Sequence, residues 1–230
     1  MVFNGFQKLT LLDFPGKVAC ILFLGGCNLR CPFCHNASLV THIDNEYTIA
    51  EDEIISYLKK RQGILEGVVI TGGEPLLRDN LTDFLKRVKA LGYSIKLDTN
   101  GFFPEKMIDL IENGLVDYVA MDIKNSFEKY PLTTGIENLD IEPLKRSINY
   151  LLSGKIDYEF RTTIVSQFHT EEDIENICKV IWGAKKYYLQ NFVDSGDIIS
   201  SGLCAICPEK LKKMGEIATQ FVPNAEIRGI

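Results

Sequence analysis

Three cysteines near the N-terminus have the spacing C-x3-C-x2-C. Cys27, Cys31 and Cys34 lie in a loop that opens with two glycines, residues 25–36. Thiolates this close in sequence can face one point, as an iron–sulfur cube or a metal ion requires. A cube held by three thiolates keeps one iron without a protein ligand, and that iron can bind a substrate or cofactor. From the spacing alone, a zinc knuckle completed by His35 or His42, or three unrelated thiols, stay open as alternatives.

The other cysteines divide into two kinds. Cys20 lies in an apolar run and Cys178 repeats with isoleucines at helical spacing, so we expect both in the core. Cys204 and Cys207 form a C-x2-C pair within residues 200–230, and Pro208 predicts a helix with Cys207 as its N-cap, where the helix dipole favours a thiolate. We interpret them as a redox pair, or as half of a metal site completed by another chain or by a partner.

Composition excludes several classes of protein. The 230 residues, 46% hydrophobic and 24% charged, predict a single domain over residues 1–230. The longest apolar run, 18–26, is far shorter than the roughly 18 residues of a membrane span, and residues 1–12 lack the pattern of a signal peptide. We therefore expect a cytoplasmic protein, and seven cysteines there argue against a disulfide framework. A net charge of −6 argues against a nucleic-acid surface.

Strands and helices alternate along the whole chain. Predicted strands cover 17–24, 68–71, 94–98, 117–122, 158–165 and 186–192, and predicted helices cover 48–63, 80–91, 104–113, 140–153 and 171–182. This alternation predicts parallel βα units, and six of them indicate an open or partial barrel; a flavodoxin-like open sheet would show the same pattern. Glycine-rich and polar clusters follow the strands, where the chemistry of such barrels gathers.

Several other side chains have structural interpretations. Thr48 is expected to begin the first helix, in a capping box with Glu51. Thr170 is expected to cap a later helix, which makes His169 a surface residue. His42 is expected in a solvated loop, and Trp182 in the core at the end of an apolar helix face.

The cysteine segment also carries a family resemblance. Cys27-Asn28-Leu29-Arg30-Cys31-Pro32-Phe33-Cys34 resembles the signature of the radical S-adenosylmethionine enzymes. In that family three thiolates hold a [4Fe–4S] cluster, the methionine moiety of S-adenosylmethionine chelates the open iron, and reductive cleavage gives a 5′-deoxyadenosyl radical. The resemblance covers essentially the whole chain. It implies an α/β fold, a partial (β/α)6 TIM-type barrel with parallel strands, in agreement with the strand count.

The same resemblance implies contacts with the cofactor. Phe33 would lie near the adenine, with His35 and Asn36 beside it. The motif Gly72-Gly73-Glu74-Pro75 looks like the family's GGEP motif: its glycines would let the backbone approach the cofactor, and Glu74 or a nearby carbonyl would accept hydrogen bonds from its ammonium group. Without the cysteines, this motif could equally be a tight turn.

Charged residues at strand ends complete the predicted site. Asp98 and Lys124 stand where relatives bind the cofactor or a cation, and Asp98, Thr99 and Asp122 resemble a monovalent-cation site, although each could instead cap a loop. Arg161 lies within an apolar strand, and a buried arginine needs an anionic partner. The cofactor's carboxylate is one candidate and a strand-end aspartate is the other.

The choice among radical enzymes rests on the N-terminal 40 residues. The stretches Gly5–Thr10, Asp13–Gly16 and Cys34–Asn36 resemble the activating enzymes of glycyl-radical proteins, nearest to those of anaerobic ribonucleoside-triphosphate reductase, in a form that shares features with pyruvate formate-lyase activase. The resemblance implies hydrogen abstraction from a backbone glycine of a partner protein, with electrons from a low-potential donor such as flavodoxin or ferredoxin. The alternatives are a radical enzyme for a small molecule, such as a 7-carboxy-7-deazaguanine synthase, and a non-enzymatic cluster or zinc carrier.

Overall fold

The computed structural model describes residues 1–43 and 48–228. Within them, eight strands form one sheet in the order β10-β9-β8-β7-β6-β5-β3-β2, in which every neighbouring pair is parallel except β2 and β3. The strands are β2 (Gly5–Thr10), β3 (Ala19–Leu24), β5 (Gly67–Gly72), β6 (Ser94–Thr99), β7 (Tyr118–Asp122), β8 (Asp157–Ile164), β9 (Tyr187–Asn191) and β10 (Ala225–Arg228). A small second sheet pairs β1 (Val2–Phe3) with β4 (Ile49–Ala50).

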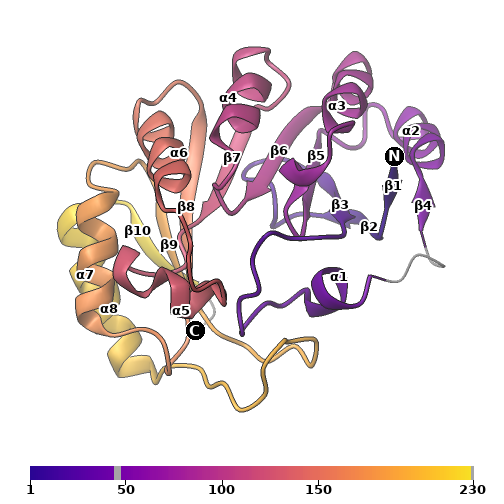
Figure 1. The fold of residues 1–230 in the computed structure, drawn as a ribbon. Helices are drawn as coiled ribbons and strands as arrows, with labels where there is room; N and C mark the ends of the chain where they lie inside the picture. Colours follow the sequence, from indigo (N-terminus) through magenta and orange to yellow (C-terminus); the bar gives the residue numbers. More distant parts are fainter. Residues whose placement is uncertain (44–47, 229–230) are drawn as a thin grey trace.

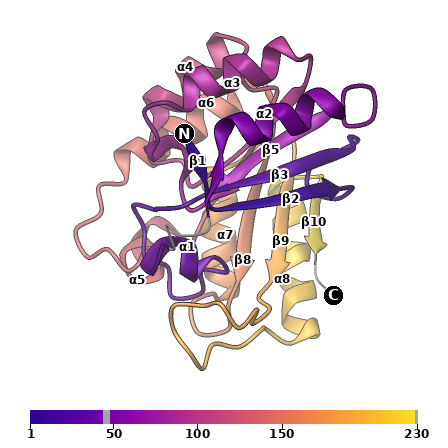
Figure 2. The same cartoon turned by 90° about the vertical axis from the view of Figure 1, so that its right-hand side faces the viewer.

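Six helices cover the outer face of this curved sheet (Figure 1). They are α2 (Glu51–Lys60), α3 (Leu81–Ala90), α4 (Pro104–Glu112), α6 (Glu142–Leu152), α7 (Glu171–Val180) and α8 (Pro208–Phe221). The short helices α1 (Ala37–Thr41) and α5 (Tyr130–Thr134) lie instead beside the loop that follows β3 (Figures 1 and 2).

The predicted partial barrel is confirmed. The edge strands β2 and β10 do not pair with each other in the described part of the chain, so the sheet curves without closing. The six predicted strands are β3 and β5 to β9, and β10 adds a parallel strand that the alternation did not predict. β2 was also missed, because half its side chains are exposed and it lacks a clear period-two pattern.

Two apolar layers hold the sheet. The larger core fills the space between the sheet and the outer helices, and includes Cys20 and Cys178 as predicted. On the inner face, Phe14, Ile21, Val69 and Tyr118 pack together near the N-terminal ends of the strands. The inner face near the C-terminal ends is polar, and it carries the site.

Three local predictions were wrong. Thr48 does not begin the first helix, because α2 starts at Glu51 and has Ala50 as its N-cap. The Glu51 carboxylate pairs instead with the N-terminal ammonium group (3.0 Å). His169 is only 3% exposed, because its ring bonds to Val165 and to the carbonyl of Lys124.

Trp182 is 71% exposed. Helix α7 ends at Val180, so Trp182 falls outside the helical period that would have turned it inward, and its ring contacts Phe221 edge-on. In contrast, the Thr170 N-cap, the Cys207 N-cap and the exposure of His42 are all confirmed, and Thr170 also forms a capping box with Asp173. None of the helices in residues 1–43 and 48–228 is long and apolar enough to cross a lipid bilayer.

Candidate active site

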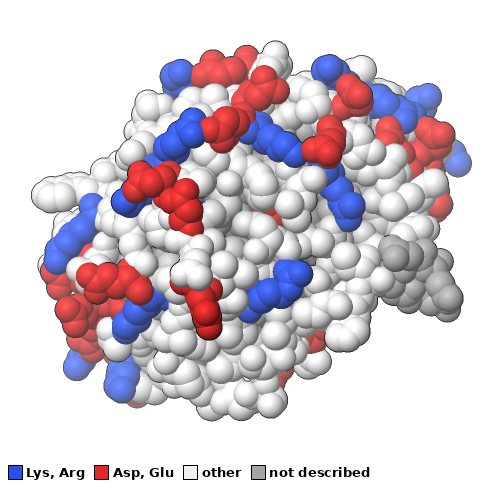
Figure 3. Space-filling view, viewed as in Figure 1, with Lys and Arg blue, Asp and Glu red and all other residues white. Residues whose placement is uncertain are grey.

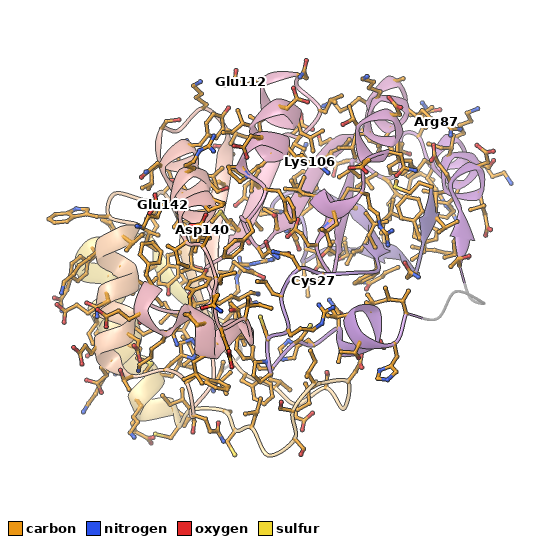
Figure 4. The ribbon with its side chains drawn as sticks, in the orientation of Figure 1. Cys27, Arg87, Lys106, Glu112, Asp140 and Glu142 are labelled. Carbon is orange, nitrogen blue, oxygen red and sulfur yellow. The ribbon has the colours of Figure 1, made fainter. Side chains whose placement is uncertain are left out.

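A cavity of about 350 Å³ opens at the C-terminal ends of the parallel strands. Every residue predicted above for the cluster, the cofactor contacts or the cation lines it, with the exception of Glu74. In Figure 4, Cys27 lies near the middle of the molecule, whereas labelled charged residues such as Arg87 and Glu112 lie on the outer helices. Figure 3 shows the same contrast: charges gather over the helices and the middle of this face is largely uncharged.

The cluster loop, residues 25–36, is fixed by its main chain. The Gly26 N–H donates to the carbonyl of Leu39 (2.7 Å) and the Arg30 N–H to that of Thr134 in α5 (2.8 Å). The Arg30 guanidinium donates back to the carbonyl of Cys27 (2.7 Å). One cluster thiol also takes part, since the Leu29 N–H donates a hydrogen bond to Cys27 Sγ (3.4 Å). The loop is therefore tied at two points to the segments of α1 and α5 and also to itself.

The two glycines of the GGEP motif allow strand β5 to pack against this loop. A Cβ on Gly73 would stand 2.0 Å from the carbonyl oxygen of Gly26, and Gly72 has a φ of +122° that side chains rarely adopt. The Glu74 N–H then donates to the same Gly26 carbonyl (2.8 Å). The structure thus gives the glycine pair a packing role in addition to its predicted approach to the cofactor.

The Glu74 carboxylate is not in the cavity, which corrects its predicted role. It is 0% exposed and accepts hydrogen bonds from the Leu76 N–H (3.0 Å), the Asn100 N–H (2.7 Å) and the Thr99 hydroxyl (3.0 Å). Burial raises the pKa of Glu74 to about 7, although the two N–H donors act in the opposite direction. The Glu74 carboxylate thus links the segments that follow β5 and β6. Of the two predicted acceptors for the cofactor's ammonium group, Glu74 or a nearby carbonyl, the carbonyl remains.

Arg161 takes the second of its two predicted partners. Its Nε lies 2.9 Å from Asp122 Oδ1 and its Nη1 3.3 Å from Asp98 Oδ2. Lys124 Nζ bonds the other oxygen of Asp122 (2.9 Å), and Lys96 pairs with Asp98. Burial alone would raise the pKa of both aspartates, but the neighbouring cations lower the pKa of each below its ordinary value, that of Asp122 most strongly.

This network also corrects the predicted cation site. The carboxylates of Asp98 and Asp122 are brought together, but by the Arg161 guanidinium, which bridges them. The Thr99 hydroxyl points to Glu74 instead. These three side chains therefore do not share a preformed cation site.

The residues on either side of Cys34, the last cluster cysteine, line one wall of the cavity. Phe33 is buried against Phe168, with ring centroids 6.0 Å apart, and the His35 ring stacks on Phe192 at 5.5 Å. Burial lowers the pKa of His35, which favours the neutral ring. Asn36 Nδ2 donates to the carbonyl of Gly72 (2.9 Å), so this wall is tied to the GGEP motif.

Several residues in or beside the cavity were not assigned a role from the sequence. Asp13 and Gln190 line the cavity, and Asn100 Nδ2 donates to Asn28 Oδ1 (2.7 Å) and reaches Cys27 Sγ (3.7 Å). Lys96 is buried and forms an ion pair with Asp98. For Lys96 a signal existed: a lysine two residues before an aspartate in an apolar strand must share a sheet face with it.

The chemistry of the cavity suits thiolate ligation. Cys27, Cys31 and Cys34 are all free and line it together, and burial raises the pKa of the Cys31 thiol to about 12, which Lys124 opposes. Amide donors beside Cys27 Sγ are of the kind that stabilise cluster-bound thiolates. Within residues 1–43 and 48–228, no three His, Cys, Asp or Glu side chains form a ready site for a single metal ion.

Cys204 and Cys207 do not join the other cysteines. Both are free and exposed, in the loop between β9 and α8, and neither lines the cavity.

Comparisons with known proteins identify the family of this chain. Residues 21–181 fit the family model described as the radical SAM superfamily. A protein of Methanocaldococcus jannaschii that carries the name glycyl-radical enzyme activating enzyme is 34% identical over 235 residues, 99% of this chain and 95% of that protein. The 7-carboxy-7-deazaguanine synthase of Koribacter versatilis is 32% identical, over 72% of this chain and 70% of its own length.

Solved structures agree on the fold. A domain of pyruvate-formate lyase-activating enzyme from Bacteroides vulgatus has a TM-score of 0.58 at 20% identity, covering 71% of this chain and 99% of its own. SuiB of Streptococcus suis bound to S-adenosylmethionine has a TM-score of 0.67 at 15% identity, covering 91% of this chain and 52% of its own. A [4Fe–4S] cluster and S-adenosylmethionine are the cofactors of the matched superfamily. The chain belongs to the radical SAM superfamily and, within it, to the glycyl-radical enzyme activating enzymes.

Proposed function

We propose that this protein activates an anaerobic ribonucleoside-triphosphate reductase by abstracting hydrogen from a backbone glycine of that partner. The observation that carries the proposal is the cavity itself, in which three thiols and a charged strand-end network meet. A relative also supports the proposal, since the Methanocaldococcus jannaschii protein that matches nearly the whole chain is named for glycyl-radical enzyme activation. The specific reductase is chosen from the resemblance of the N-terminal 40 residues.

Cys27, Cys31 and Cys34 would ligate the cluster in this proposal. When bound, the cluster and S-adenosylmethionine supply the radical that abstracts hydrogen. The protein's own part is to hold the sulfurs and to exclude water: Leu29 and Asn100 donate to Cys27 Sγ (3.4 and 3.7 Å), and buried Phe33 covers one wall.

Lys124 is the side chain best placed to bind the cofactor's carboxylate. Lys124 lines the cavity, and within the described residues its ammonium group gives one hydrogen bond, to Asp122, so two of its three donors are available to an anion there. Arg161, in contrast, is engaged with two aspartates and holds them in place. Arg161 is therefore a positioning residue in this proposal.

The test is a glycyl-radical assay under anaerobic conditions. The protein is reconstituted with iron and sulfide, reduced with a flavodoxin or ferredoxin, and mixed with S-adenosylmethionine and the reductase. We expect reductant-dependent cofactor cleavage and the doublet of a glycyl radical in paramagnetic resonance. A reductase whose radical-site glycine is replaced by alanine is the control and should give cleavage without the doublet. Zinc in place of iron, or no cleavage, would exclude an enzyme of this kind.

A second candidate function has its own support. The similarity to a 7-carboxy-7-deazaguanine synthase extends over 72% of the chain. Cofactor cleavage without a doublet from any glycyl-radical partner encoded beside this protein, together with formation of 7-carboxy-7-deazaguanine, would favour the small-molecule reaction.

A further inference from the structure

We propose that Cys207 and Cys204 form a thiol–disulfide exchange site whose substrate is a disulfide. The proposed cluster chemistry uses neither thiol, so this activity goes beyond it. Of the seven cysteines, Cys20 and Cys178 are fully buried and three line the strand-end cavity. Only Cys204 and Cys207 are exposed, so they are the thiols most accessible to a disulfide carried by a bulky molecule.

The two thiols differ in position, and the difference assigns their order of action. Cys207 is the N-cap of α8, and its side chain makes no capping hydrogen bond, so the sulfur stays free. Cysteines at helix N-termini are the usual nucleophiles of thiol–disulfide exchange. Cys204 lies three residues earlier, with its Sγ 3.9 Å from the carbonyl of Gly202. We assign Cys207 as the attacking thiol and Cys204 as the resolving thiol.

A second cavity provides a place for the substrate. It measures about 630 Å³, lies between the N-terminal ends of α7 and α8, and is lined by Cys207 but not by Cys204. Thr170, Lys210 and Met214 share its wall with Glu171 and Glu172, so the cavity that Cys207 lines has polar, apolar and oppositely charged surfaces. A cavity of this size accepts the groups that flank a disulfide in a peptide or in glutathione.

The main chain around the pair is anchored on both sides. The Cys204 N–H donates to Gln167 Oε1 (3.1 Å), and the Cys204 carbonyl accepts from the Ser166 N–H (2.9 Å). The Asn191 amide bonds both the N–H and the carbonyl of Ile206 (3.0 and 3.1 Å). Side-chain amides therefore present the two thiols in one arrangement, as a reactive site requires.

The reaction balances in two exchanges. The Cys207 thiolate attacks one sulfur of the substrate, the substrate S–S bond breaks, and its first half leaves as a thiolate that takes up the proton lost by Cys207. Cys204 then attacks Cys207 Sγ, the second half leaves with the proton of Cys204, and a Cys204–Cys207 disulfide remains. The substrate gains two electrons and two protons, and the pair loses them. A dithiol is a weaker reductant than low-potential iron–sulfur clusters, so the pair is not the electron source for cofactor cleavage.

Trapping of the mixed disulfide tests the assignment. Cluster-loaded protein is incubated anaerobically with oxidised glutathione in one arm and with an oxidised thioredoxin-class protein in the other, then analysed by intact mass. Wild type should lose the mass of two hydrogens and carry no adduct. Cys204→Ser should accumulate the adduct on Cys207, whereas Cys207→Ser should form roughly tenfold less adduct in the same time. The buried Cys178→Ala variant is the matched control and should behave as wild type.

The two arms identify the source of the disulfide. Exchange with glutathione alone supports a low-molecular-mass substrate, and faster exchange with the protein supports a protein disulfide. Equal adducts in both serine variants, or a wild type that forms no intramolecular disulfide in either arm, would overturn the proposal.

Failure of the cluster chemistry can be distinguished from failure of this site. A variant with alanine at Cys27, Cys31 and Cys34 lacks the proposed cluster ligands and keeps Cys204 and Cys207, so exchange should persist in it. Lost cofactor cleavage with intact exchange counts against the proposed function alone. Intact cleavage without exchange counts against the exchange site alone.

Discussion

Two cysteine-bearing segments follow parallel strands at the same edge of the sheet, and they differ in what holds them. The cluster loop follows β3 and is held by main-chain hydrogen bonds to Leu39 and Thr134, with its thiols in or beside the cavity. The covering segment, residues 192–207, follows β9 and is anchored near its end by the side-chain amides of Asn191 and Gln167, with its thiols exposed. The same residue type is thus placed among fixed charges in one segment and toward solvent in the other.

The two segments also touch each other. The Asp197 carboxylate accepts from the Ser38 N–H (3.0 Å) and hydroxyl (2.7 Å), and the Ser200 N–H donates to the Pro32 carbonyl (2.9 Å). In Figures 1 and 2 the covering segment runs beneath α1 accordingly. The covering segment therefore packs against one side of the cluster loop. The two segments differ in the surroundings of their thiols, which lie beside the charged residues of the cavity in the cluster loop and are exposed in the covering segment.

The largest expected effect separates the two groups of cysteines. Cys31→Ala should abolish cluster binding and reduce cofactor cleavage to background, because a cube needs all three thiolates of the loop. The Cys204→Ser, Cys207→Ser double variant should keep the wild-type iron content. Iron analysis and cofactor cleavage after anaerobic reconstitution check both variants, and loss of iron in the double variant would show that the segments share a metal site.

The next effect is on the packing of the cluster loop. Gly73→Ala should lower the free energy of unfolding by about 4 kcal/mol or more, because its Cβ would meet the carbonyl oxygen of Gly26 at 2.0 Å. Gly92→Ala is the control: its φ is +86° but nothing lies within 4 Å of its Cβ, so the cost should be about 1–2 kcal/mol. Equal urea midpoints for the two variants would contradict the packing role.

The charged network beside the cluster loop should give a pH-dependent effect. Arg161→Met leaves two half-buried carboxylates without their shared cation and should cost about 3 kcal/mol at pH 7. In wild type the pKa of Asp98 and Asp122 is lowered, so their stabilisation is present above the ordinary aspartate range and is lost only as pH falls through the lowered pKa values.

In the variant, Lys96 and Lys124 still pair with Asp98 and Asp122, so the pKa values of the two aspartates should rise from their lowered values toward the ordinary aspartate range. The cost of Arg161→Met should therefore stay constant from pH 7 to about pH 5 and shrink as pH falls further toward about 3, which urea unfolding across this range measures. Arg146→Met, which breaks an exposed pair with Glu105, should change little across the same range. A cost that grows as pH falls below 5 would exclude this account.

The smallest effect tests the contact between the segments. Asp197→Ala removes two exposed hydrogen bonds to Ser38 and should cost at most about 1 kcal/mol. Faster proteolytic cleavage within residues 193–203, with an unchanged urea midpoint, is the expected outcome. Unchanged cleavage would mean that the apolar contacts around Phe192 hold the covering segment without Asp197.

Much of this arrangement was present in the sequence. The six βα units, the partial barrel and the gathering of Cys27, Cys31 and Cys34 with Asp98, Asp122 and Lys124 could be predicted, because parallel strands bring their C-terminal ends to one edge and local patterns report strands and helices directly. The helix start at Cys207 was equally local, since Pro208 has the φ of a first helical residue.

Only the tertiary structure decided which groups pair. Glu74 was expected at the cofactor and lies buried beneath Asn100; Arg161 was expected at a carboxylate and found two within the protein; His169 was expected at the surface and is buried. Sequence position gives the edge of the sheet at which a side chain lies, because strand direction and pleat are local. The partner it takes depends on contacts between residues far apart in the chain, such as Asp98 with Arg161, and these exist only once the strands have curved around the cavity.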